Sequence, residues 1–298
     1  MSRKKQKEPK PYKKKIIKRR KPNRSITGDI GLYLFLAIVA FVMVIPLVYA
    51  VGSALKPLDE LFMFPPKWLP QNPTTDNFSD LFVTMGKSWV TFPRYVFNTV
   101  FITFMGTFGH LIVASMAAFV LAKYDFPGGK TFFRLVTVAM MFSGYVTAIP
   151  NYVIINKLNM IDTHWAVIIP AFAAPTGMFL MKQFMEGIPM ALIEAAKIDG
   201  ASEWRVFWRI VMPNVKPAWL TLIIFSVQNL WNNQAGAFIY SEEKKTLVHA
   251  LQQVSGGGIA RAGQQAAVTV VVMAVPIAIF IMSQSQILET MASSGIKD

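Results

Sequence analysis

Six long stretches without Asp, Glu, Lys or Arg constrain this chain more than any other feature of its sequence. About 20 apolar residues cross a bilayer as a helix, and each stretch is long enough to do so. The chain is 53% hydrophobic and only 15% charged, which is too apolar for an ordinary soluble domain. The sequence therefore predicts an all-α membrane protein with six transmembrane helices. The stretches are residues 30–55, 95–122, 135–156, 163–181, 217–241 and 262–288.

The basic N-terminus predicts how the chain is oriented in the membrane. Residues 1–25 carry 13 Lys or Arg and one acid, whereas the other 273 residues carry 17 basic and 15 acidic groups. Basic segments beside a first span stay in the cytoplasm and can contact anionic membrane lipid. We therefore expect residues 1–29 to be a cytoplasmic tail, residues 30–298 to be the membrane domain, and both termini to be cytoplasmic. No aromatic interleaving accompanies the basic tail, so we expect no nucleic acid partner.

A charged segment between the fourth and fifth apolar stretches, residues 187–217, predicts two short helices that meet at a glycine. Pro189 suits the start of a helix over about 190–199, and Gly200 suits its end, where a positive φ is often needed. Ser202 can cap a second helix, which Pro213 is expected to stop. The apolar face of that second helix is predicted to contain Trp204, Phe207, Trp208 and Val211.

This segment resembles the EAA loop of the membrane subunits of ABC importers. That pattern has a Glu-Ala-Ala, an Asp-Gly-Ala, a phenylalanine and two closing prolines, here Pro213 and Pro217. In the family the loop docks on a cytosolic ATPase, and small alanine faces with nearby acids suit such a contact. The resemblance implies ATPase coupling through Glu194, Ala195, Ala196, Asp199, Gly200, Ala201 and Phe207.

The same resemblance implies the fold and the partners of the chain. We expect a type I ABC importer permease fold in the cell membrane, without catalytic residues of its own. The expected partners are a second, homologous permease subunit, two ATPase subunits and an extracytoplasmic solute-binding protein. No cofactor is expected on this chain, since ATP and Mg²⁺ belong to the ATPase subunits.

Further segments are similar to the carbohydrate branch of this family, and to the smaller permease of maltose-type importers in particular. The implied substrate is an oligosaccharide or a polysaccharide. Family members often follow Trp-Asn in the fifth span with an acid and an aromatic residue, whereas this chain has Asn233-Gln234, so the particular sugar stays open. The similar segments are Ile149-Pro150-Asn151-Tyr152, residues 158–163, Gly177, Phe179-Leu180, Phe184, Trp231-Asn232 and Gly295-Ile296-Lys297.

The fifth stretch is the richest in neutral polar side chains. Gln228 and Asn232 are four residues apart and are predicted to share a helix face, with Trp231 on the same side. Amides both donate and accept hydrogen bonds, and an indole can cover the apolar face of a sugar. One interpretation is that these three residues line the translocation path. The other is that they bond to neighbouring helices, as polar groups in membrane helices commonly do.

A run of three glycines, Gly256, Gly257 and Gly258, predicts a flexible tip in the outer segment 241–261. In the family this loop reaches towards the solute-binding protein, and a plain flexible connector is the alternative. The outer segment 56–94 contains several prolines and turn residues, which predict a compact loop rather than a long helix.

Two other classes of function are disfavoured by the sequence. An ion-coupled secondary transporter usually carries ionisable groups inside its spans, but six full-length spans remain here after every charge is assigned to a loop or tail. A membrane-embedded enzyme would need a paired acid, a metal-ligand cluster or an activated nucleophile. The chain has no cysteine, and its three histidines fall in separate segments, so we predict no metal site.

Overall fold

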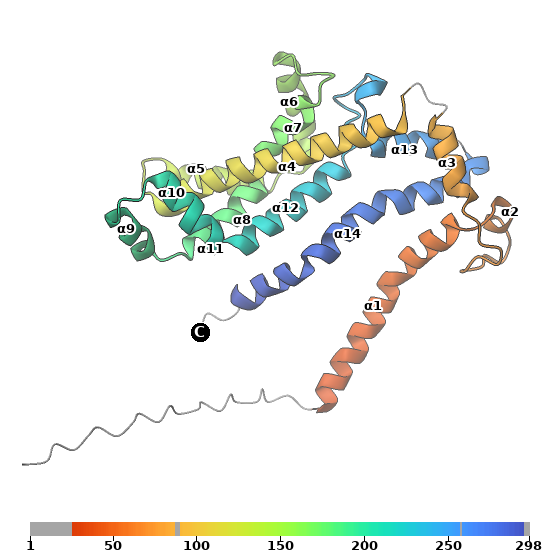
Figure 1. The fold of residues 1–298 in the computed structure, drawn as a ribbon, viewed down its shortest axis with the longest axis horizontal. Helices are drawn as coiled ribbons and strands as arrows, with labels where there is room; N and C mark the ends of the chain where they lie inside the picture. Colours follow the sequence, from red (N-terminus) through yellow and green to blue (C-terminus); the bar gives the residue numbers. More distant parts are fainter. Residues whose placement is uncertain (1–25, 87–89, 257, 295–298) are drawn as a thin grey trace, which may run out of the picture. The chain divides into compact units, whose positions relative to one another are not determined.

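A computed structural model describes residues 26–86, 90–256 and 258–294, and every regular element within these ranges is helical (Figure 1). The elements are α1 (Ile26–Ala54), α2 (Leu58–Leu61), α3 (Asp76–Gly86), α4 (Phe92–Lys123), α5 (Gly129–Ala139), α6 (Gly144–Lys157), α7 (Trp165–Phe172), α8 (Pro175–Glu186), α9 (Met190–Ile198), α10 (Glu203–Val206), the π-helical turn η1 (Phe207–Val211), α11 (Met212–Asn214), α12 (Lys216–Trp231), the 3₁₀ turn η2 (Glu242–Lys244), α13 (Leu247–Ser255), the 3₁₀ turn η3 (Ile259–Arg261) and α14 (Ala262–Ser294).

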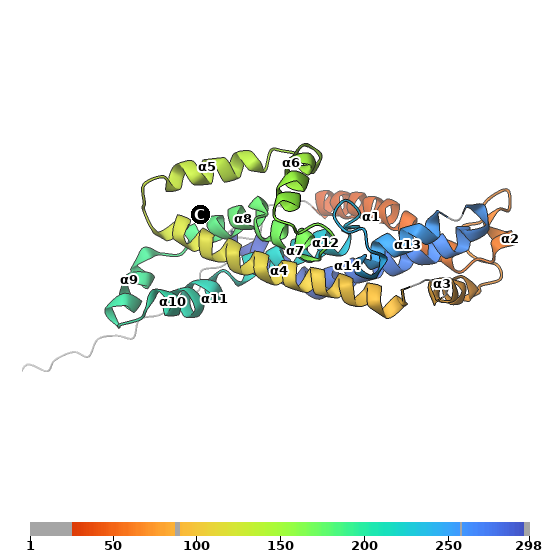
Figure 2. The same ribbon diagram turned by 90° about the horizontal axis from the view of Figure 1, so that it is seen from above.

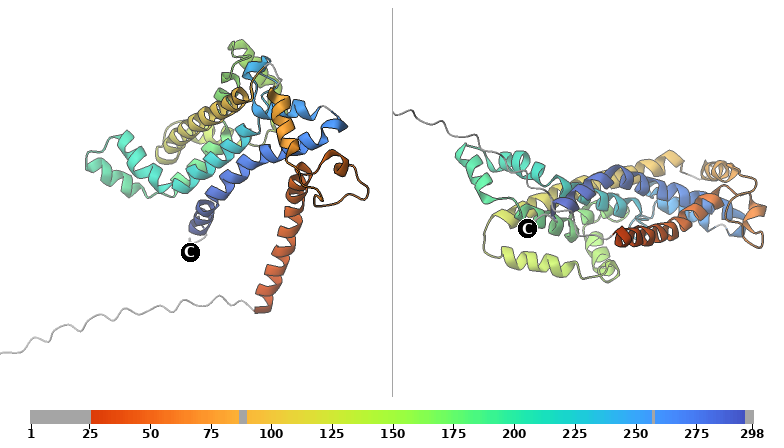
Figure 3. Two further views of the ribbon diagram at one scale, coloured as in Figure 1. Left: turned by 45° about the vertical axis from the view of Figure 1, so that its right-hand side comes forward. Right: turned by 90° about the horizontal axis from the view of Figure 1, so that it is seen from below.

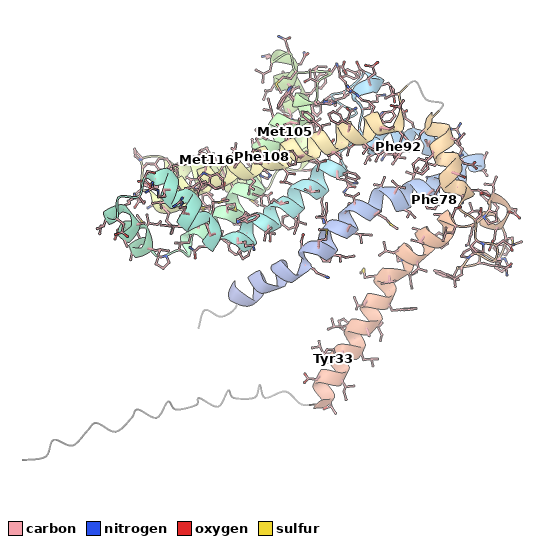
Figure 4. The ribbon with its side chains drawn as sticks, in the orientation of Figure 1. Tyr33, Phe78, Phe92, Met105, Phe108 and Met116 are labelled. Atoms are coloured by element: carbon pink, nitrogen blue, oxygen red, sulfur yellow. The ribbon has the colours of Figure 1, made fainter. Side chains whose placement is uncertain are left out.

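The chain divides into two compact units, Met1–Leu47 and Val48–Asp298. The described part of the first unit is most of α1, and its side chains, such as the labelled Tyr33, are exposed (Figure 4). A helix that is apolar on all sides is typical of a membrane span. This helix includes the first predicted span, residues 30–55, almost to its end. The basic tail lies outside the described residues.

The six predicted spans correspond to four single helical spans and two bent helix pairs. The single candidates are Thr27–Ala54, Phe92–Lys123, Trp165–Glu186 and Ile259–Gln284. If each bent pair crosses the membrane once, the described residues contain six spans, as predicted. The pairs are Gly129–Ala139 with Gly144–Lys157, bent by 113°, and Glu203–Asn214 with Lys216–Trp231, bent by 82°.

The third predicted span is not one straight helix. α5 ends at Ala139, and α6 starts anew at Gly144. The side chain of Ser143 accepts a hydrogen bond from the backbone N–H of Tyr145, so it caps the second helix. This break was not predicted from the sequence, because residues 135–156 are apolar throughout and hydropathy does not indicate where a helix is interrupted.

The fifth predicted span, 217–241, extends well past the end of the observed helix. α12 ends at Trp231, and the chain then leaves the helical conformation. The side-chain oxygen of Asn233 accepts from the backbone N–H of Ala235 at 2.8 Å. Ala235 itself has a φ of 55°, which an L residue other than Asn, Asp or Gly adopts rarely. The helix therefore ends inside an uncharged stretch, where the absence of charged residues gave no sign of its end.

The long helix α4 organises the second unit. It has 32 residues and packs against α7, α8 and α12 (Figure 2). Figure 3 shows α9 to α11 near one end of α4, and α3 and α13 near the other. Buried apolar clusters follow α4 along its length and contain Phe119 at one end, Ile102 in the middle and Tyr95 at the other end. Met105, Phe108 and Met116 mark its course in Figure 4.

The outer segment 56–94 is compact, as predicted, but part of it is helical. The buried side-chain amide of Asn77 in α3 donates to the carbonyls of Ala54, at 2.9 Å, and Lys56, at 2.7 Å. The buried carboxylate of Glu60 accepts from the backbone N–H of Gln71 at 2.6 Å. Buried polar groups need partners, and these bonds close the loop on itself.

Candidate coupling hairpin and substrate path

Residues 188–214 form a helical hairpin, which we call the coupling hairpin. Its first arm is α9, which follows Pro189 and ends before Gly200, whose φ is 79°. The second arm starts at Ser202, whose hydroxyl accepts from the backbone N–H of Arg205. The prediction of two short helices that meet at a glycine is confirmed. The capping residues decide these boundaries locally, so they could be predicted from the sequence.

The second arm is not a regular α-helix, and its predicted apolar face is only partly buried. Residues 207–211 form a π-helical turn, so Phe207 and Val211 are buried while Trp204 is 59% exposed and Trp208 is 37% exposed. The rings of Trp204, Phe207 and Trp208 still lie against one another, with centroids 5.0 to 6.2 Å apart, so the predicted face is formed but only partly buried. The arm ends at Asn214, one residue after Pro213, close to where the sequence predicted its end.

The hairpin residues that the sequence singled out divide into an outward and an inward group. Ala196, Ala201 and Phe207 pack into the chain's own apolar cluster, and Phe207 is only 3% exposed. The phenyl ring of Phe207 lies 5.5 Å from that of Phe119 on α4, measured between centroids. The inward group fixes the hairpin to the helical bundle. The outward group, which is exposed and free to meet a partner, consists of Glu194, Ala195, Asp199 and Gly200.

An apolar residue that the sequence prediction missed joins the outward group. Ile198 is 87% exposed and lies next to Asp199 at the end of α9. Its exposure could not be predicted, because the periodicity of a nine-residue helix does not show which face its neighbours cover. The outward face of α9 therefore combines acidic and apolar side chains.

A basic residue at the end of α4 holds the base of the hairpin. The ammonium group of Lys123 donates to the backbone carbonyl of Ile188 at 2.6 Å. It also lies 3.4 Å from the carbonyl oxygen of Glu186 at the end of α8. These carbonyls belong to a helix end, where backbone acceptors lack partners within the helix. Lys123 thereby joins α4 to the entry of the coupling hairpin.

A cavity of about 590 Å³ lies between α4 and the helices that pack against it, α7, α8 and α12. None of the residues that line it carries a carboxylate, ammonium or guanidinium group. Its polar groups are mostly amides, which suit a neutral, hydroxyl-rich solute better than an ion. They come from α4, α6, α8, α12 and the loop after α12, and are His110, Asn151, Thr176, Ser226, Gln228, Asn229, Asn232 and Asn233.

The buried residue His110 fixes one wall of this cavity. Its Nε2 lies 3.2 Å from the carbonyl oxygen of Ala174, so this nitrogen carries the proton and donates. Nδ1 then accepts from the hydroxyl of Ser226 at 2.6 Å. Gly177 lies against the same ring, and a Cβ there would come within 2.2 Å of Nε2. These contacts hold α4, α8 and α12 together beside the break between α7 and α8.

The three residues predicted for the substrate path do not share one surface. Gln228 and Asn232 line the cavity. Trp231 is 7% exposed and lies in a different apolar cluster, where its indole N–H donates to the carbonyl of Val272 at 3.2 Å. The expectation that Trp231 lies on the same side as Gln228 is therefore corrected. α14 packs against α12, and the indole of Trp231 points towards α14 instead of the cavity.

The outer segment 241–261 is more ordered than a flexible tip. α13 occupies nine of its residues, and Gly256 caps the end of that helix. Gly258 has a φ of 75°, in the region that favours glycine. Gly257 lies outside the described residues. Gly256 and Gly258 therefore lie between the helix α13 and the 3₁₀ turn η3.

The connection between α6 and α7 is joined to the chain that follows α12. The carboxylate of Asp162 accepts from the backbone N–H groups of Tyr240, at 3.0 Å, and Ser241, at 2.8 Å. It also accepts from the ammonium of Lys244 at 3.1 Å. Bonds from the Ser241 hydroxyl and backbone, together with the Lys244 bond, hold the pKa of Asp162 well below its usual range.

Comparison with known proteins establishes the family. Residues 111–292 match the family described as binding-protein-dependent transport system inner membrane component, which is more than half of the chain. The chain belongs to this family. It is thus a permease component of a transport system and not an enzyme, as predicted, and the match gives no support to a secondary transporter.

Individual relatives agree with this assignment. The chain is 33% identical over 203 residues to the arabinooligosaccharides transport system permease protein AraQ of Halalkalibacterium halodurans, which is 66% of this chain and 70% of that protein. The fold is similar to that of a chain in the crystal structure of a bacterial ABC transporter involved in the import of the acidic polysaccharide alginate. That chain has a TM-score of 0.75 and 21% identity, with 89% of this chain and 99% of that chain covered.

A second solved structure shows the same fold in a larger assembly. It is a bacterial alginate ABC transporter in complex with an alginate pentasaccharide-bound periplasmic protein, with a TM-score of 0.59 and 17% identity. The alignment covers 88% of this chain and 96% of that chain. The predicted all-α importer permease fold is thereby confirmed.

The contacts of Lys123, His110 and Asp162 in this inner membrane component were not predicted from the sequence. A signal for His110 was present, because Thr103 and Thr107 precede it at helical spacing in an otherwise apolar stretch, and all three are buried. Such a polar stripe predicts a face that meets other helices. No comparable pattern distinguishes Lys123 or Asp162, whose partners lie far away in the sequence.

Proposed function

We propose that this chain forms the translocation path of an ATP-driven importer for a neutral oligosaccharide. The observation that supports this substrate class is the 590 Å³ cavity, whose lining combines amides and two hydroxyls with apolar groups and carries no carboxylate, ammonium or guanidinium group. An arabinooligosaccharide permease is a relative at 33% identity. Gln228 and Asn232 are proposed to bond the sugar hydroxyls.

The coupling hairpin is proposed to dock on an ATPase subunit through its outward group. Glu194, Ala195 and Asp199 are exposed, whereas Phe207 is held in the chain's own core. This division suits a projection that is anchored at one side and offers the other to a partner. The proposed assembly contains a second permease subunit, two ATPase subunits that bind ATP and Mg²⁺, and an extracytoplasmic solute-binding protein.

In the proposed cycle, ATP closes the ATPase pair and draws the coupling hairpins of the two permease subunits together. The helical bundle then changes from inward-open to outward-open and receives sugar from the binding protein. Hydrolysis resets the assembly. Both termini of this chain are proposed to be cytoplasmic, on the side of the hairpin. The segment around Gly256 and Gly258 would then face the binding protein.

Copurification tests the docking proposal. Untagged ATPase should copurify with the wild-type chain, and the Glu194→Lys variant should lose most of it while the chain still inserts in the membrane. Because Glu194 is exposed, the substitution leaves the core intact. Normal copurification with the variant would contradict the docking assignment.

Stimulation of the assembled ATPase tests the substrate class. Neutral oligosaccharides, offered with the binding protein, should stimulate ATP hydrolysis, and uronic acid oligomers of the same length should not. The double variant Gln228→Ala/Asn232→Ala should lose the stimulation. Trp231→Phe is the control, since its indole faces α14, and it should keep the sugar preference. Equal stimulation by both sugar classes would contradict a neutral substrate.

A further inference from the structure

Three polar groups join the end of α4 to both arms of the coupling hairpin. Lys197 at the end of α9 pairs with the carboxylate of Glu203 in α10, with 2.6 Å between Nζ and Oε1. The ammonium also donates to the hydroxyl of Tyr124 at 3.2 Å. The Tyr124 hydroxyl in turn donates to the other oxygen of Glu203. Each group therefore contacts the other two, and we call this set the Tyr124 network.

Tyr124 is firmly attached to α4. It is the residue that directly follows the helix, and its backbone N–H donates to the carbonyl of Val120 at 3.0 Å. Its ring lies edge-on to Phe119, with 5.6 Å between centroids, and the Lys197 ammonium lies 5.0 Å from the ring centre. α4 thus fixes the backbone of Tyr124 and supports its ring, while the hydroxyl contacts both arms of the hairpin.

The protonation states of the network suit its hydrogen bonds. Burial and the hydrogen bond to Glu203 raise the pKa of Tyr124, so the hydroxyl keeps its proton at neutral pH. Hydrogen bonds to Glu203 and Tyr124 raise the pKa of Lys197, which therefore stays charged. The hydroxyl donates to the carboxylate and accepts from the ammonium, so its donor and one of its lone pairs are both used.

The network differs in kind from the apolar contact beneath the hairpin. Packing of Phe207 on Phe119 is not directional, so it resists separation better than it resists rotation or sliding. Hydrogen bonds to charged groups require a narrow range of distance and angle. Exposed ion pairs contribute little to stability, and Glu203 is 57% exposed, so the network is better suited to fix orientation than to stabilise the fold.

α4 links the hairpin to distant parts of the second unit as one unbroken helix. His110 in its middle lines the cavity. At its other end the hydroxyl of Tyr95 donates to Glu242 at 2.9 Å, and the amide of Asn98 donates to the carbonyl of Glu243 at 2.8 Å. A rotation of α4 that begins at residue 124 would therefore also move the cavity wall and the segment 241–261.

We propose that the Tyr124 network is the joint through which movement of the coupling hairpin is transmitted to α4 and so to the substrate cavity. Tyr124, Lys197 and Glu203 act in this proposal as positioning residues that set the orientation of the hairpin on α4. This inference depends on the proposed function, since it assumes that an ATPase moves the hairpin. It adds the side chains through which that movement passes into the membrane.

The Tyr124→Phe variant tests this proposal in the assembled transporter with its binding protein and a neutral oligosaccharide. The ring and its packing are kept, and the hydroxyl that bridges the two arms to α4 is lost. We expect ATPase copurification to stay normal and the number of ATP molecules hydrolysed per sugar imported to rise roughly threefold. Tyr145→Phe removes a hydroxyl that is exposed on α6, where Tyr145 is 93% exposed, and should leave the ratio unchanged.

A charge exchange provides a second test. Lys197→Glu and Glu203→Lys should each raise the ratio of hydrolysis to import, and the double variant, which restores opposite charges, should lower it again. An unchanged ratio in Tyr124→Phe, or loss of ATPase from that variant, would overturn the role of the network in transmission. Failure of the wild-type chain to bind an ATPase would instead overturn the proposed function.

Discussion

The coupling hairpin and α12 are neighbours in the chain, yet different contacts place their side chains. In the hairpin, Pro189, Gly200 and Ser202 set the ends of the helices through bonds within a few residues. In α12, Gln228 faces the cavity and Trp231 faces α14, and only the surrounding helices decide which goes where. A helix boundary is thus a local property here, while the function of a helix face depends on its neighbours.

Removal of the inward anchor should have the largest effect on stability and would sharpen this comparison. Phe207→Ala leaves a cavity where the ring packs against Phe119, and we expect a loss of about 3 kcal/mol in the free energy of unfolding. Thermal unfolding of the detergent-solubilised chain measures it. Glu194→Ala, on the exposed face, is the matched control and should change unfolding little. Equal losses of stability in the two variants would show that the inward and outward groups of the hairpin do not differ in their contribution to folding.

Overpacking of the cavity wall should have the next largest effect. Gly177→Ala places a Cβ 2.2 Å from His110 Nε2 and 2.6 Å from Leu222 Cδ1, so the two side chains or α8 itself must shift. We expect a loss of about 2 kcal/mol. Gly144→Ala is the control, since a Cβ at that position meets no atom within 4 Å. Similar unfolding temperatures for both variants would argue against the close approach at Gly177.

Substitution of Gly200 tests whether the conformation of the hairpin turn, which is set by nearby residues, controls ATPase binding. Gly200→Ala must adopt a φ of 79°, which costs an L residue about 1 kcal/mol, whereas Asn tolerates this region better. We therefore expect weaker ATPase copurification with Gly200→Ala than with Gly200→Asn. Full binding by both variants would mean that the turn conformation does not control docking.

The smallest expected effect concerns the chain that follows α12, which Asp162 holds. Because the pKa of this carboxyl is lower in the folded chain than its value near 3.9 in an unfolded chain, its contribution is present above about pH 4. It is lost as the pH falls towards the folded pKa. Asp162→Asn tolerates the same φ of 58° and should cost at most about 1 kcal/mol at pH 6. The difference in unfolding temperature from wild type should shrink as the pH is lowered from 5 to 3. A constant difference would exclude the charge as its cause.

The sequence by itself determined the helical membrane fold, the approximate spans and the ends of the coupling hairpin. Each of these depends on hydropathy or on capping bonds between residues that are close in the chain, as with Ser202 and Arg205. Tertiary structure alone decided that Phe207 points inward and Trp231 away from the cavity, and that Tyr124 meets Lys197 and Glu203. The contacts of Tyr124 join residues 73 and 79 positions apart, and no local pattern in the sequence indicates which helices will lie together.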